Sequence, residues 1–125
     1  MNSELGETNP ITLRNVSNLQ LLRLEVAEGL EQREAKPVID AVQSKLEATL
    51  GAFVALDDPW VYRLDLVSLK TNLGLVAVWQ GKPKKARKLL RQIEEIDLSP
   101  EDPLVKRVAV LKERVEGLER KKGKR

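Results

Sequence analysis

The 125-residue sequence contains neither cysteine nor histidine. Their absence excludes disulfides and removes the thiolate and imidazole ligands that structural zinc sites use. A nucleophile and its base would have to come from serine, lysine, tyrosine or carboxylate side chains. The glycines Gly51, Gly74 and Gly81 are too scattered to form a phosphate-binding loop. We therefore predict a protein that is not an enzyme and that uses no metal or cofactor.

Aromatic residues are also scarce, at 3% of the chain, whereas 42% of residues are hydrophobic and 33% are charged. This composition is typical of a globular protein with an aliphatic, helical core. Trp60 and Tyr62 follow Pro59 at a predicted helix start. Because aromatic side chains are enriched in interface hot spots, each of the two either packs in the core or contributes to a binding surface.

Long hydrophobic runs are missing as well. The chain has no stretch of about 20 apolar residues that could cross a membrane, and the start MNSELGETNP lacks the features of a signal peptide. We therefore expect a soluble, cytoplasmic protein. The length suits one domain, which we place at residues 1–120 and which is followed by a basic disordered tail at residues 121–125.

The first predicted helix begins at Thr8-Asn9-Pro10, where a capping side chain precedes a proline in the first turn. Pro37 is expected to end this segment and to open a second helix, with Gly51 as its C-terminal cap. The first helix carries an apolar stripe at near-helical spacing, formed by Ile11, Val16, Leu19, Leu22, Val26 and Leu30.

Three further helices follow from the same signals. Residues 52–56 are apolar throughout and either continue the second helix or form a buried connector. The third helix is expected from Asp57-Asp58-Pro59 to about Gln80, the fourth from Pro83, and the fifth over residues 104–120 after a cap at Ser99 or Asp102. Because the turns are short, neighbouring helices should be antiparallel. We predict an all-α fold of about five helices arranged as antiparallel hairpins.

The segment from about Val67 to Pro100 resembles a tetratricopeptide repeat, which places small residues where paired helices cross closely. The residues that carry the resemblance are Leu73, Gly74, Ala77, Gly81, Ala86, Leu90 and Ile93. The resemblance implies a stack of helical hairpins with the last helix as a cap. The alternative is a generic α-helical bundle, since Lys70 stands where the repeat has an aromatic residue and Leu98 where it has proline.

Charge is unevenly distributed. Residues 1–60 hold ten acidic and five basic residues, and residues 61–125 hold nine acidic and seventeen basic ones. Four glutamates are predicted on one side of the first helix as a solvated acidic face: Glu25, Glu28, Glu31 and Glu34. The fourth helix is strongly basic and is either a solvated face or a phosphate-binding patch.

The sequence favours a protein that binds another protein or itself, as a small adaptor or chaperone-like module. The candidate contact residues are Trp60, Tyr62, Lys85, Lys88 and Arg91. The alternative is nucleic-acid binding through the phosphate backbone, by Lys84, Lys85, Arg87, Lys88, Arg91, Lys121 and Lys122. A third possibility is a subunit of a larger assembly, whose apolar third helix is partly exposed until assembly.

Overall fold

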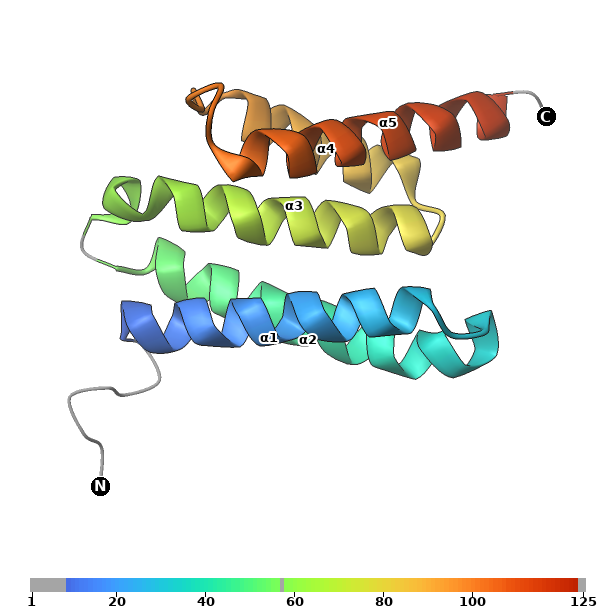
Figure 1. The fold of residues 1–125 in the computed structure, drawn as a ribbon, viewed down its shortest axis with the longest axis horizontal. Coiled ribbons are helices and arrows are strands. Elements are labelled where there is room, and N and C mark those ends of the chain that lie inside the picture. Colours follow the sequence, from blue (N-terminus) through green and yellow to red (C-terminus); the bar gives the residue numbers. More distant parts are fainter. Residues whose placement is uncertain (1–8, 57, 124–125) are drawn as a thin grey trace. The chain divides into compact units, whose positions relative to one another are not determined.

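The computed structural model describes residues 9–56 and 58–123, and this part of the chain is all-α, as predicted (Figure 1). The chain separates into two compact units, residues 1–69 and 70–125, with the boundary inside one helix. The single domain expected from the length stays a prediction. The elements in order are α1 (Pro10–Glu28), α2 (Gln32–Val54), the 3-10 helix η1 (Pro59–Tyr62), α3 (Arg63–Trp79), α4 (Pro83–Glu94) and α5 (Pro103–Gly123).

The first unit is built on an antiparallel hairpin of α1 and α2 (Figure 1). The α1 start is the one predicted: the Oδ1 atom of Asn9 accepts a hydrogen bond from the Ile11 amide at 2.9 Å, and Pro10 occupies the first turn. Two fully buried alanines, Ala27 on α1 and Ala35 on α2, belong to the core of this unit. Its larger buried side chains on α2 are Ile39, Val42, Leu46 and Phe53.

Two predictions for the second helix are wrong. Pro37 lies inside α2, which begins five residues earlier at Gln32, and the chain breaks instead at Gly29. The amide that Pro37 lacks would have bonded the carbonyl of Arg33 in the first turn. Arg33 is exposed, so water can satisfy that carbonyl and the helix tolerates the proline. Gly51 is not a cap either, because α2 continues to Val54 and the apolar run extends the helix.

The apolar stripe predicted for the first helix is largely on the outside of α1. The side of α1 that faces the core carries Leu13, Ser17, Gln20, Leu24 and Ala27. Periodicity had identified a genuine helical face, but α1 has two faces with large apolar residues. Which of them is covered depends on the position of α2, and helical spacing alone does not contain that information.

The second unit contains the end of α3 together with α4 and α5. The turn between α3 and α4 is the predicted one: Gly81 adopts φ 73°, and the Lys82 amide bonds the Ala77 carbonyl at 2.9 Å. This is a Schellman motif, for which glycine is the favoured residue. Pro83 then begins α4 as expected.

The last helix begins after a side-chain cap, because the Asp102 Oδ1 atom accepts a hydrogen bond from the Leu104 amide at 2.9 Å. It runs through Gly123, beyond the predicted end at Arg120, and so includes the first three residues of the predicted basic tail. Residues 124 and 125 lie outside the described part of the chain.

Gly74 on α3 lies very close to Leu111 on α5. A Cβ atom built on Gly74 would lie 2.7 Å from the Leu111 Cδ2 atom, well inside van der Waals contact. The Leu111 side chain is fully buried and has little room to move. The missing side chain of Gly74 thus allows α5 to pack closely against α3. The resemblance to the repeat had instead placed Gly74 where the third and fourth helices cross.

We expect Gly74→Ala to destabilise the protein relative to Gly117→Ala, by at least about 1 kcal/mol in urea unfolding. Gly117 lies on α5, and the nearest side-chain atom to a Cβ there is 3.9 Å away. Gly117→Ala should therefore stabilise by about 0.5–1 kcal/mol through helix propensity alone. Gly74→Ala should cost less in a Leu111→Ala background than in the original protein, because the side chain that it meets is then removed. Equal stability of the two glycine variants would contradict the packing described.

Candidate functional site

Large apolar side chains line the exposed side of α1. Leu19, Leu22 and Val26 follow one another at steps of three and four residues, which places them on one side of the helix. Their exposed fractions are 54%, 61% and 66%. Ile11 lies on the same side near the start of α1 and is also exposed, and exposed Leu30 follows in the turn after α1. We call Ile11, Leu19, Leu22 and Val26 the outer face of α1.

The core-facing side of α1 is unusually polar. Ser17 and Gln20 are buried there, and the Arg23 Nη1 atom donates a hydrogen bond to Gln20 Oε1 at 3.3 Å. Burying polar groups costs free energy unless they find partners, whereas leaving leucine and valine in water forgoes the gain from their burial. Stability of the separate chain would favour the reverse arrangement. The outer face therefore has the character of a contact surface.

A shallow apolar depression extends this surface onto α2. It is lined by Leu22, Arg23 and Val26 from α1 and by Val38 from α2. The depression therefore lies along the edge of the hairpin, where both helices contribute apolar atoms.

Acidic residues surround the C-terminal end of α1. Glu25, Glu28, Glu31 and Glu34 are all exposed, as predicted. They do not form one side of one helix, because α1 ends at Glu28 and Glu34 already belongs to α2. The last turn of α1 contains no basic residue, so its negative helix end and its carboxylates add to one another. No cluster suited to a metal ion occurs within residues 9–56 and 58–123.

The N-terminal end of α1 is basic and is fixed to the start of α3. The Arg14 guanidinium donates two hydrogen bonds to Asp65, from Nε at 2.8 Å and from Nη2 at 2.9 Å. This bidentate contact raises the pKa of Arg14. The arrangement orients the α1 start and leaves half of the Arg14 side chain accessible.

The predicted aromatic residues have different environments. Trp60 is 62% exposed, and the Arg63 guanidinium lies 5.3 Å from its ring centre. Tyr62 is half-buried, with its ring centre 5.7 Å from that of Phe53. Trp60 is therefore accessible to a partner, whereas Tyr62 contributes mainly to the packing of the first unit.

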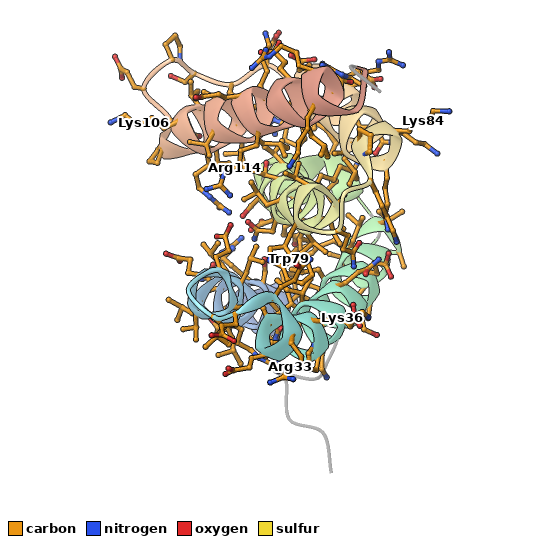
Figure 2. The ribbon with its side chains drawn as sticks, turned by 90° about the vertical axis from the view of Figure 1, so that its right-hand side faces the viewer. Arg33, Lys36, Trp79, Lys84, Lys106 and Arg114 are labelled. Atoms are coloured by element: carbon orange, nitrogen blue, oxygen red, sulfur yellow. The ribbon has the colours of Figure 1, made fainter. Side chains whose placement is uncertain are left out.

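The basic residues predicted on the fourth helix separate into two groups. Lys84, Lys88 and Arg91 are exposed on α4, and Lys84 projects away from the helix (Figure 2). Arg87 instead donates from Nε to the Oε2 atom of Glu119 on α5 at 3.0 Å, with a second contact from Nη2. Lys85 is half-buried, and Lys121 is exposed at the end of α5. The side chain of Lys122 lies outside the described part of the structure.

The five residues predicted to contact a partner protein do not belong to one unit. Trp60 and Tyr62 are in the first unit, and Lys85, Lys88 and Arg91 are in the second. Sequence reasoning did not propose the outer face of α1 as a site. The signal was present, since α1 has large apolar residues at helical spacing on one side and a second apolar series on the other.

No protein-family model, characterised protein or solved structure matches this chain. The resemblance to a tetratricopeptide repeat therefore stays a prediction. No helix in residues 9–56 and 58–123 is both long and apolar enough to span a membrane.

We expect Glu119→Gln to reduce stability at neutral pH by less than about 1 kcal/mol, because the pair is partly exposed. The hydrogen bond from Arg87 lowers the pKa of Glu119. A lowered folded-state pKa stabilises the protein above the unfolded value of about 4.3, and this contribution disappears as the pH falls through the folded value. Urea unfolding of both proteins from pH 7 to pH 3 should therefore show a difference that shrinks below about pH 4.3. The control is Glu113→Gln, an exposed carboxylate on the same helix; an equal pH-dependent loss there would refute the Arg87 assignment.

Proposed function

We propose that this protein is a non-enzymatic interaction module that binds another polypeptide through the outer face of α1. The observation that carries the proposal is the exposure of Leu19, Leu22 and Val26 on a helix whose opposite side buries Ser17 and Gln20. Residues at i, i+3 and i+7 are the anchors by which amphipathic helices engage partners. The polar residues on the core side indicate that α1 was not selected for burial of its most apolar side.

The hairpin supports this function mechanically. Ile39, Val42 and Leu46 are fully buried on α2 and hold the core-facing side of α1 in place. The ion pair of Arg14 with Asp65 adds a directional contact at the start of α1. Because α1 is already a formed helix, its ordering adds little entropic cost to binding.

The structure also bears on the alternatives that the sequence left open. The exposed apolar series lies on α1, whereas α3 buries Val67, Leu69, Leu73 and Val76 and keeps its other large apolar residues after Leu64 at least partly buried. We therefore do not propose an assembly in which the third helix provides the contact surface. The exposed apolar residue of α3 is Leu64, at the first turn.

Nucleic-acid binding is the second candidate, and the exposed cations of α4 favour it. Lys84, Lys88 and Arg91 lie at steps of four and three residues and are exposed together on the helix. Such a row can contact successive phosphates without reading bases. Arg87 is less suited, because its guanidinium is already bound to Glu119.

For the main proposal, we expect Leu22→Glu to abolish partner capture while leaving the free energy of unfolding within about 0.5 kcal/mol of the original protein. The side chain is 61% exposed, so the substitution removes a contact surface and creates no buried charge. The tagged protein and the variant would be compared by capture from native lysate with quantitative mass spectrometry. Val110→Glu, at another exposed apolar position, on α5, is the matched control. Identical capture profiles for all three proteins would rule out the outer face.

For the second candidate, we expect a Lys84→Gln, Lys88→Gln, Arg91→Gln variant to lose oligonucleotide binding measured by fluorescence anisotropy. Binding of the original protein should fall by roughly tenfold or more between about 50 and 200 mM salt, because three contacted phosphates release counterions. Leu22→Glu should bind like the original protein. No detectable binding at low salt would exclude this candidate.

A further inference from the structure

We propose that the partner of the outer face is a second copy of this chain, bound by antiparallel pairing of α1 with α1. This inference rests on the proposed function of the outer face and specifies its partner. Three observations support it: the arrangement of the exposed apolar side chains, the order of the charged side chains along α1, and the burial of the main apolar residues of α4 and α5 among the described residues.

The centre of the outer face is symmetric about the point midway between Gln20 and Leu21, because Leu19 and Leu22 are equally distant from that point. A two-fold axis through this point would place Leu19 of one copy level with Leu22 of the other at the centre. Such an interface uses the same patch on both subunits, as closed dimers do.

The spacing also fits the seam of a short coiled coil. Asn15, Leu19, Leu22 and Val26 follow at steps of four, three and four residues, which is the alternation of positions that face a partner helix. In the antiparallel register, Asn15 of one copy lies level with Val26 of the other. A single polar residue at such a seam fixes the register at some cost in stability.

Charge order favours the antiparallel direction. Arg14 lies near the start of α1, whereas Glu25 and Glu28 lie near its end, on the same flank of the outer face. Antiparallel pairing brings Arg14, whose side chain is half accessible beside its Asp65 partner, near Glu28 of the other copy, and it also aligns the two helix dipoles favourably. Parallel pairing would bring the two acidic C-terminal ends of α1 to the same end of the pair and would oppose the favourable dipole alignment.

Helices α4 and α5 of a second copy are poor partners for the outer face of α1. The apolar residues Ala86, Leu90 and Ile93 of α4 are fully or nearly fully buried, as are Leu111 and Val115 of α5. Neither helix therefore has these side chains available for a second copy. The four apolar side chains of the outer face form a small interface compared with the ~1,200–2,000 Å² of a standard one, so we expect a concentration-dependent dimer.

The register can be tested by disulfide trapping, because the chain contains no cysteine of its own. Full-length Asn15→Cys and Val26→Cys proteins would be oxidised separately and after mixing, and analysed on non-reducing gels. The proposed register brings the two different positions level, whereas identical positions in the two copies are displaced by roughly 16 Å along the helix. We expect the mixture to give about tenfold more cross-linked dimer than either protein alone. Cross-linking of Val26→Cys mainly with itself would overturn the antiparallel arrangement.

Sedimentation velocity separates failure of this inference from failure of the proposed function. The original protein and Val110→Glu should show dimers that dissociate on dilution, and Leu22→Glu should dimerise about 100-fold more weakly. A monomer up to about 100 µM, with capture of another protein still lost in Leu22→Glu, would overturn the dimer and leave the outer face as a binding surface. No effect of Leu22→Glu on either measurement would overturn both.

Discussion

Close approach between aliphatic helices is the constraint on which both units depend. Phe53 is the fully buried aromatic side chain among the described residues, so aromatic bulk cannot fill wide gaps between helices. Small residues occupy core positions instead: Ala27 and Ala35 in the first unit, and Gly74 and Ala86 in the second. Dispersion and burial both fall quickly when helices separate, and this explains why a missing Cβ at Gly74 has structural consequences.

Ion pairs connect the helices at the edges of these cores. Arg14 reaches Asp65 in the first unit, and Arg87 reaches Glu119 in the second, each through two hydrogen bonds. Since the four side chains are partly solvated, each pair adds little free energy. The planar guanidinium nevertheless fixes a direction, and so orients α1 against the start of α3 and α4 against α5. The contact with Glu119 also occupies the Arg87 guanidinium, so Lys84, Lys88 and Arg91 are the exposed α4 cations left to contact phosphates.

The polarity of α1 connects the fold to the proposed function. A helix in a hairpin needs one covered side, and α1 meets this need with Leu13, Leu24 and Ala27 while it also buries Ser17 and Gln20. Its leucines at positions 19 and 22 are left for a contact outside the hairpin. The dimer that we propose would bring Leu19 of one copy level with Leu22 of the other. Stability of the hairpin and readiness for association are thus assigned to opposite sides of one helix.

The sequence by itself determined the all-α class, the starts at Pro10 and Pro83, and the turn at Gly81, because capping and backbone preferences act over a few residues. It misjudged Pro37 and Gly51, since a proline is tolerated in an exposed first turn and the apolar run after the exposed Gly51 extends the helix to Val54. It located exposed cations on α4, but the contact of Arg87 with Glu119 joins residues on different helices. Only the tertiary structure decided which side of α1 is covered. Periodicity reports that residues share a side, whereas burial depends on where the second helix packs.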